Sequence, residues 1–292
     1  MSICKFQTPM LFLVGAPKCG TTSLADCLAK ERNIGYPGEK EINFFSRSDV
    51  SDLYYANQYV IRDRSAYLDR FPRRSGIQYN LDASVSYFDS DQALFEISSL
   101  KCRKKVIILL RDPVSRAASH FTMDVTSGYL KGITFSELIR RHFPDDNDLF
   151  STAYHQVVGL GFYFKYVCRW QQTIGACNVH VASLSEMVRE PTYFFDQLSS
   201  FLGFKLDSRT LESRNTASAP RNFLLAALYR SPARRALRHR LPEEWRRKLK
   251  SLVFVSAPSS AVSDDDHRFL RRVYADDSAA IKSYCGIDLL AD

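Results

Sequence analysis

The sequence has little of what marks an exported, membrane-spanning or disulfide-stapled chain. Its 292 residues include seven cysteines, an odd number with no C-x-x-C pair, so the sequence predicts neither a disulfide framework nor a zinc site. The apolar run near the N-terminus, Met10–Val14, is far shorter than the roughly 20 residues that cross a bilayer. No basic segment precedes this run, as one would in a secretory leader. These absences favour a reduced, cytoplasmic setting and a buried strand at Met10–Val14.

An excess of charge of one sign is confined to one stretch of the chain. The chain has 40 Lys and Arg against 32 Asp and Glu, a formal net charge of +8. Residues 221–250 hold ten basic and two acidic residues, so this stretch carries the whole excess. We expect it to form solvated amphipathic helices, with contact to an anionic membrane surface or an anionic acceptor as the alternative. No recognisable nucleic-acid module accompanies it, so no nucleic-acid partner is predicted.

The remaining chain alternates short apolar runs with longer amphipathic ones. This alternation predicts an α/β fold, a P-loop-like doubly wound parallel sheet flanked by helices. No internal repeat or low-complexity linker is present, so we expect a single domain over residues 1–292, with a basic helical C-terminal appendage over about 221–292. Strands are predicted at residues 10–14, 77–81, 105–110 and 179–183, and helices at 21–31, 113–124, 163–172, 191–201 and 267–281, the last one preceded by the capping aspartates 264–266.

A glycine-bounded loop follows the first strand. Gly15–Thr22 reads GAPKCGTT, with the G-x-x-x-x-G spacing of a nucleoside triphosphate loop. Backbone N–H groups of such a loop and the following helix N-terminus form an anion site. The lysine expected after the second glycine is Thr21 here, and Lys18 lies inside the loop instead. An ammonium there would adjoin the first phosphate and its substituent, which argues against a magnesium-dependent kinase. The alternative is a tight turn with a surface lysine.

A second polar motif begins where the strongest predicted strand ends. Arg111 leaves this strand directly, and Asp112 with Pro113 supplies a helix cap and a first-turn proline. Ligands of parallel sheets bind at the carboxyl edge, so Arg111 and the first loop should face the same space. Arg111 and Ser119 would offer a guanidinium and a hydroxyl to a phosphate monoester, Ser119 from a face shared with Arg116. The alternative is that Arg111 pairs with Asp112 or another acid to brace the loop.

The two motifs, PKCGTT and RDPVSRAASHF, resemble those of the sulfotransferase family that uses 3′-phosphoadenosine 5′-phosphosulfate (PAPS). In that family the first motif holds the 5′-phosphosulfate and the second holds the 3′-phosphate. The resemblance implies transfer of a sulfuryl group from PAPS to a hydroxyl or amine, with 3′-phosphoadenosine 5′-phosphate (PAP) as product and no metal. It implies nucleotide contacts at Lys18, Cys19, Gly20, Thr21, Thr22, Arg111 and Ser119, with Lys18 also catalytic.

The segment EINFF, which starts at Glu41, resembles one in the heparan-sulfate-modifying branch of that family and its bacterial relatives. There an acid three residues before Phe-Phe is the general base, and the matching position is Glu41. Packing near Phe44 and Phe45 is expected to raise its pKa. Glu39 is a nearby competitor, an exposed salt bridge is the alternative, and His120 or His155 is a minor alternative base.

The resemblance extends from about residue 9 to 205, through Ser84–Phe88, Gly161–Tyr163 with Trp170, and Phe201–Phe204. Two departures leave the acceptor open. The lysine of the heparan-type enzymes before S-P is Ala83 here, and Asn215–Arg221, with Arg221 as the candidate contact, stands in for a late nucleotide-clamping loop. By the resemblance, we expect the acceptor to be a carbohydrate, a lipid or a natural product. A P-loop kinase-like phosphotransferase and a non-catalytic nucleotide or polyanion binder remain as alternatives, and nothing in the sequence indicates an oligomeric state.

Overall fold

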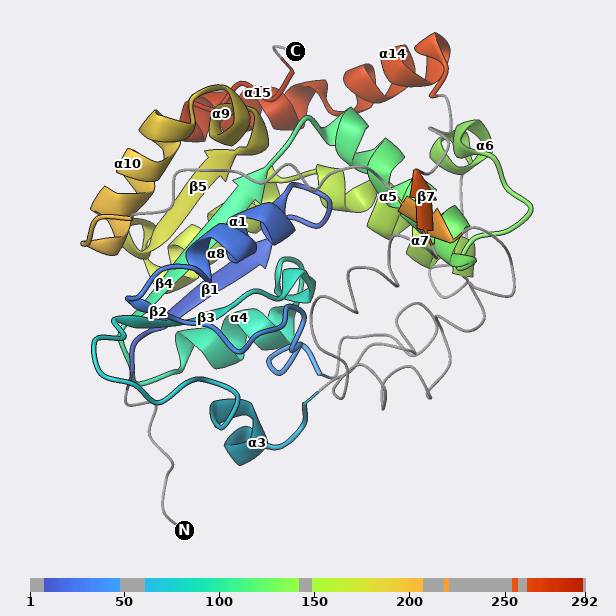
Figure 1. The fold of residues 1–292 in the computed structure, drawn as a ribbon. Helices are drawn as coiled ribbons and strands as arrows, with labels where there is room; N and C mark the ends of the chain where they lie inside the picture. The colour runs from blue at the N-terminus through green and yellow to red at the C-terminus, as the bar shows by residue number, and fades with distance from the viewer. Residues whose placement is uncertain are drawn as a thin grey trace.

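The computed structural model describes residues 8–47, 61–141, 149–206, 218–220, 254–256 and 262–290. At its centre lies a five-stranded sheet in the order β2-β3-β1-β4-β5, in which all four pairings are parallel (Figure 1). The predicted parallel α/β sheet is therefore confirmed. Its strands are β1 (Met10–Gly15), β2 (Ile34–Gly35), β3 (Tyr79–Asp82), β4 (Lys104–Leu110) and β5 (Val179–Ser183).

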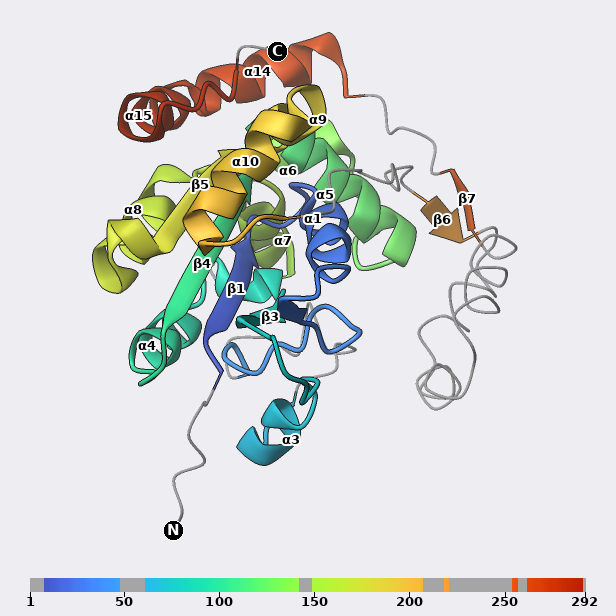
Figure 2. The same cartoon turned by 60° about the vertical axis from the view of Figure 1, so that its left-hand side comes forward.

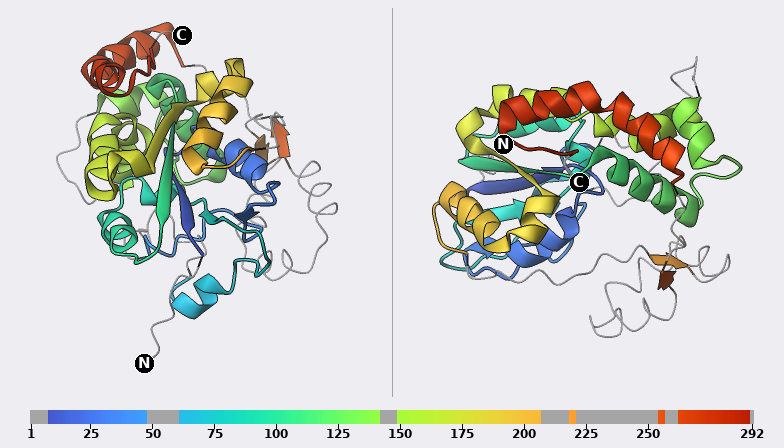
Figure 3. Two further views of the ribbon diagram at one scale, coloured as in Figure 1. Left: turned by 90° about the vertical axis from the view of Figure 1, so that its left-hand side faces the viewer. Right: turned by 90° about the horizontal axis from the view of Figure 1, so that it is seen from above.

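Helices cover both faces of this sheet, as Figure 2 and Figure 3 show. Side chains of β1 alternate between two cores because successive residues of a strand point to opposite faces. Phe12 packs with α4 (Asp91–Ser98), α8 (Phe164–Ile174) and α15 (Ala275–Cys285), whereas Leu13 packs with α1 (Thr21–Leu28), α9 (Leu184–Arg189) and α10 (Pro191–Leu202). Two covered faces explain why β1 is apolar at every position.

The helix after β4 starts as the sequence predicts. Asp112 caps α5 (Pro113–Ser127) by accepting hydrogen bonds from the backbone N–H groups of Val114 and Ser115. Pro113 occupies the first turn, where its missing N–H has no partner to lose. The helix runs three residues past its predicted end at Asp124 and stops at Gly128, which has a left-handed backbone.

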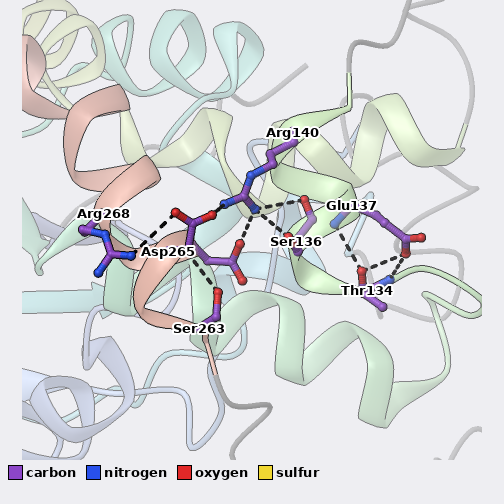
Figure 4. Close-up of polar contacts among 8 residues, drawn as sticks. Thr134, Ser136, Glu137, Arg140, Ser263, Asp265 and Arg268 are labelled. Atoms are coloured by element: carbon purple, nitrogen blue, oxygen red, sulfur yellow. Dashed lines mark hydrogen bonds and ion pairs between the residues drawn. The ribbon is translucent and has the colours of Figure 1, made fainter.

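A third apolar cluster joins α5, α7 (Leu149–Val157), α6 (Phe135–Arg140) and α14 (Asp264–Val273) beside the sheet. Figure 4 shows the polar contacts at its rim. Thr134 and Glu137 form a reciprocal capping box at the start of α6. Arg140, at the end of α6, pairs with Asp265 at 2.7 Å and with Asp266, so it ties α6 to α14.

The C-terminal helix differs from its prediction. The expected helix 267–281 starts earlier, at Asp264, because Ser263 and not the aspartates provides the cap. It is also divided, with α14 ending at Val273 and α15 starting at Ala275. The aspartates lie in the first turn, where acidic side chains favour the helix dipole. Buried residues of both helices enter the cores, so residues 262–290 of the expected appendage pack against the α/β body.

The remaining described elements are short. They are α3 (Arg64–Leu68), the single 3-10 turns Val85–Tyr87, Gly159–Gly161 and Ala176–Asn178, and β6 (Ser218–Pro220), which pairs antiparallel with β7 (Phe254–Ser256). The basic stretch 221–250 lies outside the described residues. Within the ranges given above, the structure has no helix that is both long and apolar enough to cross a membrane.

Candidate functional site

The predicted site residues follow strands that end at one edge of the sheet. β1 lies between β3 and β4, and all three run in the same direction. The segments that leave their carboxyl ends therefore start side by side. These segments carry Lys18 after β1, Ala83 after β3 and Arg111 after β4. This is the edge at which parallel α/β sheets bind ligands.

The first helix begins without a side-chain cap. Gly20 is its N-cap residue, and no side chain accepts a hydrogen bond from the first turn. By contrast, α4, α5, α6 and α9 are capped by Ser90, Asp112, Thr134 and Ser183. The first-turn N–H groups of α1, with the positive end of its dipole, remain available for an anion. Gly20 has φ +84, and a Cβ there would lie 2.6 Å from Leu184 Cδ1.

Lys18 projects from this loop towards α5. Its Nζ contacts Met123 Sδ at 3.5 Å. Burial lowers the pKa of Lys18; Asp124 opposes this shift, while the positive charges of Arg111 and Lys40 add to it. Ser119 is half-buried and lies one helical turn before Met123, on the same face of α5. Ser119 is therefore on the side of α5 that faces Lys18.

Arg111 adjoins the phosphate loop itself. Its guanidinium Nη1 donates to the backbone carbonyl of Lys18 at 3.4 Å. The carbonyl of Arg111 in turn accepts a hydrogen bond from the Tyr163 hydroxyl at 3.0 Å. Asp112 is occupied with capping α5. The structure thus places the guanidinium of Arg111 against the backbone of Lys18.

The side chain of Cys19 lies in the core of the protein. It is fully buried, with Sγ 3.7 Å from the Pro17 carbonyl and 3.6 Å from the Tyr163 hydroxyl. Burial raises the pKa of this thiol to about 11, so it is an unreactive structural group. The Cys19 N–H donates to the Ala16 carbonyl at 3.3 Å. Cys19 therefore supports the loop from the protein core.

Glu41 is held beside the segment that follows β3. Its backbone N–H donates to the Ala83 carbonyl at 3.0 Å, and its Oε2 accepts from the Val85 N–H at 3.0 Å. Its other oxygen, Oε1, lies 3.2 Å from Lys40 Nζ. Glu39, the competing acid, pairs with Arg70 at 2.9 Å. Two contacts from different segments therefore fix the direction of the Glu41 carboxylate.

Phe44 and Phe45 follow Glu41 on the same segment. Both rings are buried in the core, where they pack on Tyr67 with ring centroids 4.5 and 5.4 Å away. Their role is to anchor the segment that carries Glu41.

Sequence reasoning missed Lys40. Its Nζ donates to Thr21 Oγ1 at 3.0 Å and to Thr22 Oγ1 at 3.3 Å, and it pairs with Glu41. Lys40 thus connects the phosphate loop to the candidate base. The one sequence signal is its place directly before Glu41, because nothing in a single sequence indicates that residues 19 positions apart meet.

Asp82 was missed as well. This fully buried carboxylate at the end of β3 accepts hydrogen bonds from Tyr67 (2.9 Å), Tyr87 (2.8 Å) and Ser84 (2.7 Å). Burial raises its pKa to about 6, against the lowering effect of these donors. The hydroxyls hold the turn after β3, which presents the Val85 N–H to Glu41.

The inner face of α5 carries a buried polar stripe. Arg116 is fully buried and binds His120 Nδ1 at 3.2 Å and the carbonyls of Gln156 and Val157. That Ser119 offers its hydroxyl from a face shared with Arg116 stays a prediction. Burial and the charge of Arg116 lower the pKa of His120 well below its usual value. Being inaccessible, His120 is not a base for an acceptor.

Three further predictions concern the edges of the site. His155 pairs with Asp89 at 3.0 Å. Arg221 lies outside the described residues, and of Asn215–Arg221 only residues 218–220 are described, as β6. Over the part of the chain that the structure describes, no group of three or more His, Cys, Asp or Glu is placed to hold a metal ion.

Known proteins resemble this chain in sequence and in fold. A family model described as the sulfotransferase domain matches residues 8–251. Human heparan sulfate glucosamine 3-O-sulfotransferase 3B1 is 25% identical over 203 residues, which are 68% of this chain and 47% of that protein. The bifunctional heparan sulfate N-deacetylase/N-sulfotransferase 1 of Caenorhabditis briggsae is 24% identical over 213 residues, 69% of this chain and 23% of that protein.

The chain thus spans about half, or less, of the length of these curated relatives. Among solved structures, a sulfotransferase from Alicyclobacillus acidocaldarius has a TM-score of 0.67 at 24% identity. That superposition covers 97% of this chain and 98% of the other. At this identity the likeness concerns the fold.

Proposed function

Because this chain belongs to the sulfotransferase domain family, we propose that it transfers a sulfuryl group from PAPS to a hydroxyl or amine of an acceptor. The observation that carries the proposal is the convergence of Lys18, Arg111 and the uncapped start of α1 on one loop, with Glu41 joined to that loop through Lys40. A positively charged loop can bind an anionic donor, and a carboxylate beside it can take the proton of a hydroxyl or amine. Together they suit transfer of an anionic group to such a nucleophile.

The residues present fit an adenosine that carries phosphates on its 3′ and 5′ oxygens. Thr21, Thr22 and the N–H groups at the start of α1 are proposed to hold the 5′-phosphosulfate, with the backbone of Cys19 and Gly20 shaping the loop. Arg111 and Ser119 are proposed to hold the 3′-phosphate, since a guanidinium binds a phosphate dianion in bidentate fashion. A contribution from Arg221 stays a prediction.

In the proposed reaction PAPS supplies the sulfuryl group. Glu41 takes the proton from the acceptor hydroxyl or amine while the acceptor oxygen or nitrogen forms its bond to sulfur. The bond between sulfur and the bridging phosphate oxygen breaks, and its electron pair stays on that oxygen. Lys18 stabilises the charge growing there, and the fixed loop donors hold the reacting groups in line. The products of the reaction are PAP and the sulfated acceptor.

The acceptor class follows from the relatives only as a proposal. The two curated relatives named above are heparan sulfate enzymes, so carbohydrates come first in a test panel, before lipids and natural products. The experiment supplies PAPS with labelled sulfur and measures label transferred to each acceptor by the wild-type protein. Transfer to any acceptor supports the proposed reaction, and PAP binding without transfer to any of them favours a non-catalytic binder.

The same assay tests the base. Glu41→Gln removes the proton acceptor but keeps the side-chain size, so transfer should fall by at least about 100-fold. Glu39→Gln is the matched control, because Glu39 pairs with Arg70 and should leave the rate within about twofold. A Glu41→Gln protein that works at the wild-type rate contradicts the assignment of Glu41.

A further inference from the structure

Lys40 makes three polar contacts beside the phosphate loop. An ammonium has three N–H donors, and Lys40 directs Nζ to Thr21 Oγ1 (3.0 Å), Thr22 Oγ1 (3.3 Å) and Glu41 Oε1 (3.2 Å). Its side chain is 14% exposed, so this is a partly desolvated contact and not a freely moving surface lysine. Charge-assisted contacts in such a place are stronger than those of surface pairs.

The Lys40 contacts define which groups remain free to bind an anion. Thr21 and Thr22 accept from Lys40 through oxygen lone pairs, which leaves each hydroxyl hydrogen to be donated elsewhere. Lys40 also lowers the pKa of Lys18 after the larger effect of burial, so both ammonium groups act on the same space. An anion in the loop would meet Lys40 and both hydroxyls together.

Glu41 and an anion in the loop therefore compete for one cation. The carboxylate is an anion itself, and its Oε1 lies 3.2 Å from Lys40 Nζ. A phosphate bound at the start of α1 would draw Lys40 away from Glu41. The carboxylate would then lose its positive neighbour, which strengthens it as a proton acceptor.

We propose that Lys40 is a second cation of the 5′-phosphate site and exchanges its contact with Glu41 for the phosphate of the bound nucleotide. The inference rests on the proposed function. It assigns Lys40 the task of releasing the base only when the donor is in place. Lys40 is a positioning residue with respect to Glu41 and a binding residue with respect to the nucleotide.

Two nucleotides that differ only at the 5′ end test the binding part. Calorimetric titration compares PAP with adenosine 3′-phosphate, which lacks the 5′-phosphate. Lys40→Met should weaken PAP binding by about 10-fold or more, the range of one charge-assisted hydrogen bond. It should leave adenosine 3′-phosphate within about twofold, which also reports an intact fold. Lys40→Arg, which keeps the charge, should recover most of the lost PAP affinity.

A double-mutant cycle tests the exchange. Glu41→Gln removes the competitor for Lys40, so PAP should bind about threefold or more tightly to this variant. In the Lys40→Met background the same substitution should bring no such gain, because the cation that carries the coupling is gone. A gain of equal size in both backgrounds shows direct repulsion between Glu41 and the nucleotide, and it overturns the exchange.

Lys101→Met is the control for loss of one positive charge. Lys101 is exposed and lies before the amino end of β4, at the opposite edge of the sheet. If Lys40→Met behaves like Lys101→Met, or weakens both nucleotides equally, the inference is wrong while the proposed function stands. If the wild-type protein binds neither nucleotide, the proposed function fails and the inference falls with it.

Discussion

Single residues at the edge of the sheet fall into two groups, those that face the phosphate loop and those buried behind it. Lys18, Lys40 and Arg111 contact the loop or project from it. Asp82 and Asp124 are fully buried. The first group bears on ligand binding and transfer, and the second affects mainly the stability of the fold and its dependence on pH.

Two substitutions in the first group should differ in kind. Lys18→Ala removes charge stabilisation that grows during transfer, so turnover should fall by about 100-fold or more, with PAP affinity reduced far less. Arg111→Ala removes a contact made equally before and during the reaction, so it should chiefly weaken PAP binding. Turnover in the labelled-sulfate assay and calorimetry separate the two effects. Equal loss of turnover and affinity in both variants contradicts the assigned roles.

Asp124 should make stability fall as the pH rises. Burial raises its pKa to about 8, although Lys18 opposes the shift, so the folded state keeps a proton that the unfolded state loses above about pH 4. The native protein is thus destabilised progressively from about pH 4 to pH 8. Asp124→Asn carries no such charge and should gain on the order of 1–3 kcal/mol relative to wild type between pH 5 and pH 8.

Urea unfolding at the two pH values measures this difference, since groups titrating equally in both proteins cancel. An advantage of Asp124→Asn that is the same at pH 5 and pH 8 would contradict the raised pKa. If the stability advantage of Asp124→Asn became smaller as the pH rises, the shift in the pKa of Asp124 would have the opposite sign.

At the scale of elements, the carboxyl end of β1 depends on the absence of a side chain. A Cβ on Gly15 would lie 2.7 Å from Phe88 Cβ. Phe88 is buried and packs on Tyr163 and Tyr166, so it has little room to move. Gly15→Ala should destabilise the protein by about 2 kcal/mol or more.

Gly76→Ala is the comparison for this prediction, measured by the same urea unfolding. Gly76 has φ +85 and open space around its Cβ position, so only the left-handed backbone is penalised, by about 1 kcal/mol. A Gly15→Ala protein no less stable than Gly76→Ala would show that the contact with Phe88 is looser than described.

Elements with a strong local pattern could be predicted from the sequence. β4 and β5 lie within one residue of their predicted bounds, because buried parallel strands are continuous apolar runs. β2, with two residues, is too short to show any pattern. The expected helix 267–281 was wrong at its start because Ser263 outcompetes the aspartates as the cap. Its division at Tyr274 depends on packing, since Tyr274 is buried and donates to the Val158 carbonyl.

The site shows the same division between local and distant signals. Lys18, Arg111 and Glu41 could be named because each lies in a short motif of recognisable spacing. Lys40 and Asp82 could not, because their significance lies in contacts with Thr21 and Tyr67, which are distant in the chain. Reasoning from a single sequence uses the spacing of residues along the chain and does not reveal contacts between residues that are distant in it.

At the scale of the whole molecule, the C-terminal helices are tied to the rest by Arg140. Asp266, buried on α14, pairs with this arginine, and Arg140→Ala would leave its carboxylate without the cation, so the free energy of unfolding should fall. Arg268→Ala is the control, because Arg268 and Asp265 are exposed and 3.7 Å apart, which predicts a change within about 0.5 kcal/mol. Urea unfolding of both variants measures the difference. Equal losses of stability in the two variants would mean that the contacts of Arg140 drawn in Figure 4 do not stabilise the protein.

The claim on which the rest depends is that one sheet edge recognises an adenosine with phosphates at both ends. Calorimetric titration of the wild-type protein with PAP and with ATP, each with and without magnesium, tests it most directly. We predict that PAP binds without magnesium and at least about tenfold more tightly than ATP, a difference of about 1.4 kcal/mol. Tighter binding of ATP that requires magnesium would contradict the account and favour a phosphotransferase.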